Sequence, residues 1–143
     1  MDLYVKDLTL RPLALALAML ACLVGCGGGK TAPVNGRVKL KDGSDVSVLA
    51  GYSLTFEPEG GKTSAVGELD RDGIFKLSTF GANDGAMPGK YRVAINQPNN
   101  PDPDKPPTKS KLPAKYANLE TSGLAVEVKP GQNNIELELD KAP

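Results

Sequence analysis

The chain has 143 residues, and its 17 basic and 17 acidic side chains leave no formal net charge. This length corresponds to about one domain, and the balanced charge argues against a nucleic-acid-binding protein, which normally carries a basic surplus. The sequence contains no histidine, which excludes Ser-His-Asp, Cys-His and zinc–histidine chemistry and leaves only enzymes built on carboxylates or lysine. The 16 glycines and 12 prolines are typical of a turn-rich β protein.

Residues 1–25 have the layout of an export signal. A charged start ends at Arg11, and an apolar run follows over residues 13–24 with small residues at its end. As a helix, this run would span only ~18 Å, which is too short for the ~30 Å hydrocarbon core of a bilayer. The pattern therefore predicts a signal peptide rather than a transmembrane anchor.

The end of this leader, residues 23–26 (LVGC), resembles the bacterial lipobox. The resemblance implies cleavage before Cys26, transfer of diacylglycerol to its thiol and acylation of its new amino group. Such chains would hold the protein on a bilayer, because each buried methylene contributes ~0.8 kcal/mol. The alternative is an ordinary signal peptide that happens to contain cysteine; Cys22 is a poorer lipidation candidate, because Met19 stands where the lipobox usually has leucine.

The mature chain is predicted to be one β domain, residues 34–140, on a flexible lipidated tether, residues 26–33. Both cysteines lie at or before position 26, so this domain would hold neither a disulfide nor a cysteine metal cluster. Apolar and polar residues alternate with a period of two in seven segments, which predicts seven strands in a two-sheet antiparallel sandwich. These segments are 34–40, 52–57, 64–69, 75–78, 91–95, 124–129 and 135–140.

Several segments of this domain resemble a known family. VNGRVKLKDG, YSLTFEPEGG, LDRDGIFKLST and PGKYRVAI are similar to bacterial carboxypeptidase regulatory-like domains, which belong to the transthyretin-like, prealbumin-type group. The later run LPAKYANLETSGLAVEVKPGQNNIELEL resembles small lipoproteins of the same group. The resemblance covers residues 34–139 and implies an all-β, seven-stranded Greek-key sandwich that acts as a non-catalytic accessory or binding module. Transthyretin-like enzymes that hydrolyse cyclic ureides use histidines, which this chain lacks.

Two short motifs are weak candidates for binding. Asp70 and Asp72, followed by Gly73, resemble the start of a calcium loop, but Gly81 stands where such a loop has its final glutamate. A tight turn explains this motif better, and no metal is predicted. Tyr116, beside Lys115, is the best candidate for stacking on a sugar; the alternative is a tyrosine that plugs one end of the sandwich.

Paired acidic residues give no catalytic prediction. Glu136 and Glu138 alternate on one solvent face of a strand. We expect them to pair with Arg37 and Lys39 if the first and last strands are neighbours. No catalytic residue and no cofactor is therefore predicted.

Loop positions follow from strand direction, which reverses at each antiparallel turn. Loops 41–51, 70–73 and 97–123 would share one end, which we predict to be the binding surface, and loops 58–62, 80–89 and 130–134 would face the lipid. An additional strand within 44–51 would reverse this assignment. The Pro-rich segment 97–113 is predicted to be a solvated loop, with a proline-recognition segment as the alternative.

Together, these patterns predict an exported, lipid-anchored monomer of the bacterial cell envelope, held to the membrane through Cys26. Because Gly27 follows the cysteine, the chain resembles lipoproteins sorted to the outer membrane. Its partner would be a protein or glycan of the envelope, and no nucleic acid. The alternatives are a carbohydrate-binding module and, third, a histidine-free hydrolase.

Overall fold

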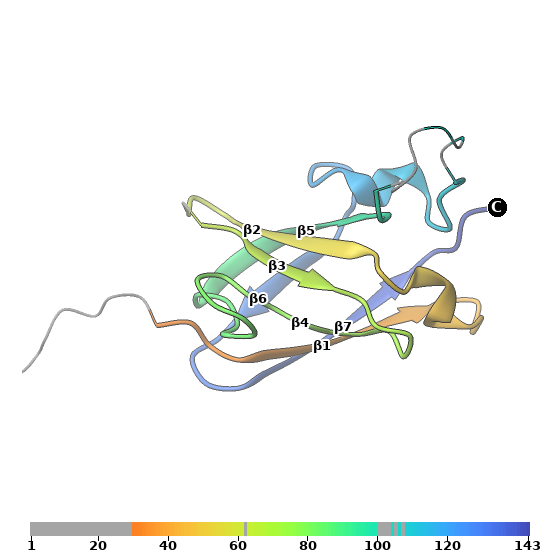
Figure 1. Ribbon diagram of the computed structural model, residues 1–143. Coiled ribbons are helices and arrows are strands. Elements are labelled where there is room, and N and C mark those ends of the chain that lie inside the picture. The colour runs from red at the N-terminus through yellow and green to blue at the C-terminus, as the bar shows by residue number, and fades with distance from the viewer. Residues whose placement is uncertain (1–29, 62, 100–103, 105, 107) are drawn as a thin grey trace, which may run out of the picture.

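The computed structural model describes residues 30–61, 63–99, 104, 106 and 108–143. The predicted signal peptide, Cys26 and the first residues of the predicted tether lie outside this part of the chain. The described residues form an all-β sandwich of two sheets, one of three strands and one of four, so the predicted fold class is confirmed at this level (Figure 1).

The three-stranded sheet has the order β4-β1-β7, and the four-stranded sheet has the order β3-β2-β5-β6. All seven predicted segments form strands, with boundaries shifted by a few residues. The strands are β1 (Val34–Leu40), β2 (Ser53–Pro58), β3 (Ala65–Glu68), β4 (Ile74–Lys76), β5 (Gly89–Asn96), β6 (Ala125–Val128) and β7 (Asn133–Leu139). Two short 3₁₀ helices, η1 (Val46–Leu49) and η2 (Ala114–Ala117), lie between them.

The expectation of a wholly antiparallel sandwich is wrong at one pair of strands. β1 and β7 are parallel neighbours, aligned from Val34 beside Asn133 to Leu40 beside Leu139. The physical reason is strand direction: each strand reverses the one before it, so the first and seventh strands point the same way. Once these two are neighbours, their pairing has to be parallel.

The predicted contact between the outer faces of the first and last strands is present. Lys39 Nζ lies 2.7 Å from Glu136 Oε2, and both side chains are about half exposed. An exposed pair of this kind contributes little stability. It does show that the polar residues of both strands share one solvent face.

The core lies between the two sheets and contains the apolar residue of each alternating pair. β1 has the burial pattern of the sequence prediction, with every second residue buried from Val34 to Leu40. The ring of Phe56 joins the two sheets, because its centroid lies 5.8 Å from that of Phe75 and 6.3 Å from that of Tyr91. One contiguous cluster therefore holds both sheets together.

Residues 44–51 contain η1 and no strand. The side chain of Asp45 accepts a hydrogen bond from the backbone N–H of Ser47 and caps η1, while Leu49 is buried. The order of strand directions is therefore unchanged, and the loops divide between two ends as predicted.

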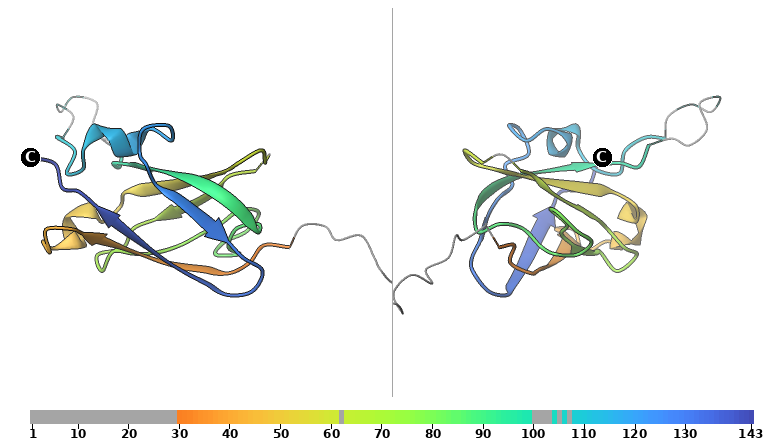
Figure 2. Two further views of the ribbon diagram at one scale, coloured as in Figure 1. Left: turned by 180° about the vertical axis from the view of Figure 1, so that it is seen from behind. Right: turned by 60° about the vertical axis from the view of Figure 1, so that its left-hand side comes forward.

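We call the end at which β1 begins the proximal end and the end at which β1 and β7 finish the distal end. Figure 2 shows the C-terminus at the distal end, away from the start of β1. The chain already contacts the domain before β1, because Ala32 is buried and exchanges backbone hydrogen bonds with Ala86. Ala32 and Pro33, which belong to the predicted tether, are thus held against the domain.

Gly36 on β1 provides a test of the core packing. A Cβ atom at this position would lie 1.9–2.3 Å from three atoms of the Phe75 ring. We expect Gly36→Ala to lower the free energy of unfolding by about 1–3 kcal/mol, because the ring has no room to move without disturbing the core. Urea denaturation measures this, with Gly81→Ala as the control.

The control position is open, since a Cβ at Gly81 would meet no atom within 4 Å. Gly81→Ala should change stability by less than about 0.5 kcal/mol. Equal stabilities for the two variants would contradict the described packing of Phe75 on β1.

Candidate functional site

The distal end brings together segments that are far apart in the sequence. The N–H of Gly51 donates to the carbonyl of Leu69, just before the Asp70–Gly73 turn, and the Cα of Gly51 faces Pro98. The N–H of Lys111 donates to the hydroxyl of Tyr52. The turn at 70–73 and the described residues of the Pro-rich segment therefore share this end, as strand direction predicts.

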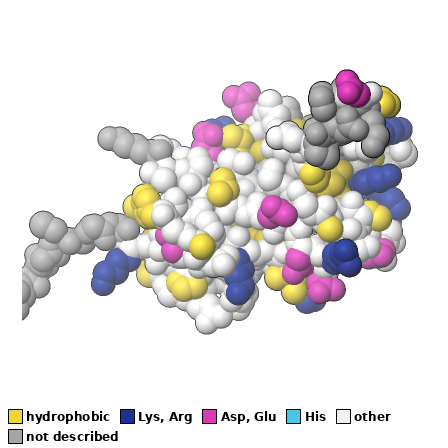
Figure 3. Space-filling view, in the orientation of Figure 1, with side chains coloured by type: hydrophobic (Ala, Val, Ile, Leu, Met, Phe, Trp, Pro, Cys, Tyr) yellow, Lys and Arg dark blue, Asp and Glu magenta, His cyan; other side chains and the backbone are white. Residues whose placement is uncertain are grey.

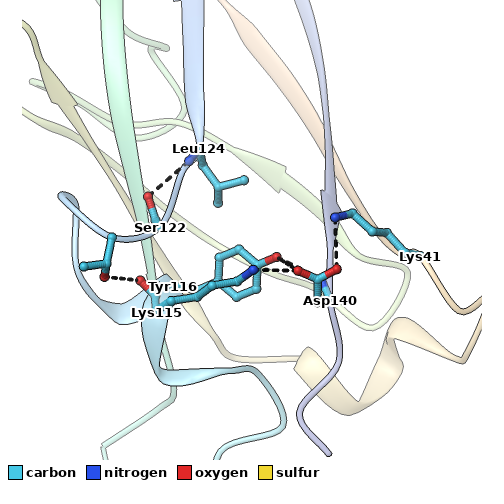
Figure 4. Close-up of polar contacts among 7 residues, drawn as sticks. Lys41, Lys115, Tyr116, Ser122, Leu124 and Asp140 are labelled. Carbon is cyan, nitrogen blue, oxygen red and sulfur yellow. Dashed lines mark hydrogen bonds and ion pairs between the residues drawn. The ribbon is translucent and has the colours of Figure 1, made fainter.

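A polar cluster of Lys41, Lys115, Tyr116 and Asp140, the Asp140 cluster, closes the distal end (Figure 4). Asp140 follows β7, and its Oδ1 lies 2.9 Å from Lys41 Nζ. Its Oδ2 lies 2.7 Å from Lys115 Nζ and accepts a hydrogen bond of 2.9 Å from the Tyr116 hydroxyl. The backbone N–H of Asp140 donates to the same hydroxyl at 2.9 Å. One carboxylate thus connects the end of β1, η2 and the end of β7.

The charges of the cluster stabilise one another. Hydrogen bonds from Lys115, Lys41 and Tyr116 hold the pKa of Asp140 well below its usual range. The hydrogen bond to Asp140 raises the pKa of both Lys115 and Lys41. Through these contacts the ionised carboxylate fastens the segments that follow β1 and β7 to η2, which is a structural role.

Tyr116 does not offer the exposed ring that the sugar-stacking hypothesis requires. Its side chain is only 2% exposed, and the ammonium of Lys115 lies over the ring, 4.8 Å from its centroid. Stacking on a sugar needs an open aromatic face. Tyr116 instead fills one end of the sandwich, which was the alternative prediction from the sequence.

The carboxylate of Asp70 is used within its own turn. Its Oδ1 accepts hydrogen bonds from the backbone N–H groups of Asp72, at 2.9 Å, and of Ile74, at 2.8 Å. Gly73 has a φ of 71°, a left-handed conformation that glycine adopts without strain. The tight turn accounts for this motif, and among the described residues no group of three acidic or cysteine side chains could hold a metal ion.

A polar groove on the outer face of the four-stranded sheet was not found from the sequence. It has a volume of about 540 Å³, within the usual range for ligand sites, and β2, β5 and residues 117–120 line it. Ala94, with its small side chain, lies at its base opposite Thr55. The alternation of β2 and β5 showed which residues face outward, but no local signal showed that residues 117–120 fold back beside them.

Arg92 and Glu57 lie opposite each other in this groove. Arg92 Nη2 is 3.5 Å from Glu57 Oε1, and both side chains are about 40% exposed. Arg92 Nε is buried without a hydrogen-bond partner among the described residues. Asn96 and Asn118 add amide groups to the lining of the groove. The groove therefore combines donors and acceptors that suit a polar, hydroxyl-rich ligand.

Comparison with protein-family models, with curated proteins and with solved structures finds no match for this chain. Within the part of the chain that the structure describes, no helix has the length and apolar character needed to cross a membrane.

The depressed pKa of Asp140 predicts a dependence of stability on pH. Because the pKa is lower in the folded state than the ordinary value near 4, the stabilising contribution is complete above that value and is lost as the pH falls below it. We expect Asp140→Asn to be less stable than the native chain at pH 7, with a difference that narrows steadily below pH ~4. Urea denaturation at several pH values measures this difference.

The matched control is Glu138→Gln, which removes a carboxylate from the outer face of β7 without touching the cluster. A stability difference for Asp140→Asn that stays constant between pH 7 and pH ~2.5 would show that the ionised carboxylate does not hold the distal end.

Proposed function

We propose that the chain is a membrane-anchored lipoprotein of the bacterial cell envelope, whose sandwich is a non-catalytic binding or structural module of the carboxypeptidase regulatory-like, transthyretin-like type. Two features support this type: the seven strands in two sheets and the four segments that resemble the family. Neighbouring strands are mostly not consecutive, with β1 beside β4 and β7 and β2 beside β5. This order supports a Greek-key arrangement.

The observation that carries the proposal is the separation of the two ends of the sandwich. The chain joins the domain at the proximal end, where Ala32 pairs with Ala86. The 41–51 and 70–73 connections lie at the opposite end, together with Pro98 and Lys111, about 23 Å away over the seven residues of β1. A lipid on Cys26 would therefore place the distal loops on the side of the domain away from the membrane, where a partner could contact them.

A non-catalytic role is supported by the state of the polar side chains. The carboxylate of Asp140 is bound by two ammonium groups and a hydroxyl, and that of Asp70 is bound by backbone N–H groups. The chain has no histidine to serve as a base. Contact with a partner, rather than chemical conversion of one, is the function that these groups favour.

Mass spectrometry of the mature N-terminus tests the anchor. We expect a protein that begins at Cys26 and carries a diacylglycerol on its thiol. Cys26→Ser should move the protein from the membrane fraction to the soluble fraction, because no acyl chain remains to hold it. Cys22→Ser is the control and should leave the protein on the membrane. An unmodified N-terminus at another residue would overturn the proposed address.

The groove between β2, β5 and residues 117–120 favours a carbohydrate-binding module as a second candidate. Its Arg92–Glu57 pair and its amides are polar groups able to bind sugar hydroxyls. Tyr116→Ala would not test this function, because the substitution removes a buried ring and about 3–5 kcal/mol of stability.

Arg92→Gln is the better variant for a glycan array with the full chain. If the groove binds a glycan, we expect this substitution to reduce the signal at least about tenfold, which corresponds to the loss of one charge-assisted hydrogen bond. Lys129→Gln, an exposed substitution outside the groove, should leave the signal unchanged. Equal loss from both variants would point to general electrostatic attraction instead.

A further inference from the structure

Phe80 is the most exposed large hydrophobic side chain among the described residues. It is 67% exposed, compared with 52% for Val66 and 44% for Val48. In the view of Figure 3, basic and acidic side chains are interspersed over the surface, with isolated hydrophobic ones between them. Exposure of a phenylalanine ring to water costs free energy. The loop that carries Phe80 therefore has to hold the ring on the surface.

The loop from residue 78 to residue 86 fixes Phe80 in the exposed position. The carboxylate of Asp84 accepts hydrogen bonds from the backbone N–H groups of Thr79, Phe80 and Gly81, at 2.7, 3.1 and 3.1 Å. The hydroxyl of Thr79 donates to the carbonyl of Gly85 at 2.7 Å. These bonds order the backbone on both sides of the phenylalanine, so its ring stays outside the core.

This loop lies directly against the point at which the chain joins the domain. Ala32 N donates to Ala86 O at 2.7 Å, and Ala86 N donates to Ala32 O at 3.1 Å. Gly85 packs so closely that a Cβ there would lie 1.9 Å from Ala32 O. In Figure 1 the loop is the green segment at the end of the sandwich where β1 begins.

The length of the preceding chain determines what covers this end. Ala32 is only six residues after Cys26, so the proposed lipid attachment lies at most ~20 Å from the Phe80 loop. The carboxylate of the loop, Asp84, is bound by three backbone N–H groups of the loop itself. Ala82 and Pro88 in this loop and its continuation are exposed and apolar, and the exposed Asn83 beside Ala82 is polar but uncharged.

We propose that Phe80 inserts into the headgroup–acyl boundary of the bilayer that holds the lipidated Cys26, and so fixes the proximal end of the sandwich on the membrane. This inference rests on the proposed lipid anchor and adds a second, protein-based contact. Aromatic side chains favour this boundary, and one fixed ring near a tether restricts rotation of the domain. The distal end then points away from the lipid.

The lack of tryptophan in the chain permits a direct test. Phe80→Trp and Val48→Trp each introduce a single tryptophan, at the proximal loop and in η1 at the distal end. The full lipidated protein is placed in phosphatidylethanolamine–phosphatidylglycerol vesicles, with or without bromine on the acyl chains. We expect blue-shifted emission and several-fold quenching by bromine for Phe80→Trp, and neither effect for Val48→Trp.

The outcomes separate this inference from the proposed function. Acylated Cys26 together with unquenched emission from Phe80→Trp would overturn the inference and leave the anchor intact, whereas an unacylated Cys26 would remove both. A blue shift of Phe80→Trp that appears without lipid and grows with protein concentration would indicate contact between two copies of the chain, and would also overturn it. Urea denaturation confirms that each variant is folded.

Discussion

The central position of β1 is the constraint on which the rest of the structure depends. This strand is bonded to β7 along all seven of its residues, and to β4 on its other side from Asn35 to Arg37. The first strand therefore reaches its final place only when both the middle and the end of the chain are present, and such long-range pairing is slow and cooperative. It also means that the proposed tether continues directly into an inner strand. Hydrogen bonds to both β4 and β7 hold this strand in place against a force applied through the tether.

Alternating strand direction gives the sandwich two ends with different chemistry. The proximal end holds the junction with the tether and the exposed Phe80, while the distal end holds the Asp140 cluster. At the distal end, charges are neutralised by partners from three separate segments. At the proximal end, the carboxylate of Asp84 is satisfied by backbone N–H groups of its own loop. Each end is thus stabilised in a way suited to its proposed surroundings.

The site residues show where reasoning from the sequence stops. The Asp70–Gly73 turn could be predicted, because an aspartate before a glycine forms local hydrogen bonds within a few residues. The burial of Tyr116 could not, because η2 packs against β5 and the Tyr116 hydroxyl bonds to Asp140, 24 residues later. Likewise, the groove at Arg92 exists only because residues 117–120 fold back beside β5.

The sequence by itself determined the all-β class, the positions of the seven strands and the turns between them, because alternation and turn chemistry act over a few neighbouring residues. It also determined the absence of histidine chemistry. Only the tertiary structure decided which strands are neighbours, that β1 and β7 are parallel, and that Tyr116 is buried while Phe80 is exposed. These features depend on which distant segments come into contact. A period of two shows which face of a strand is buried, but not which other segment covers that face.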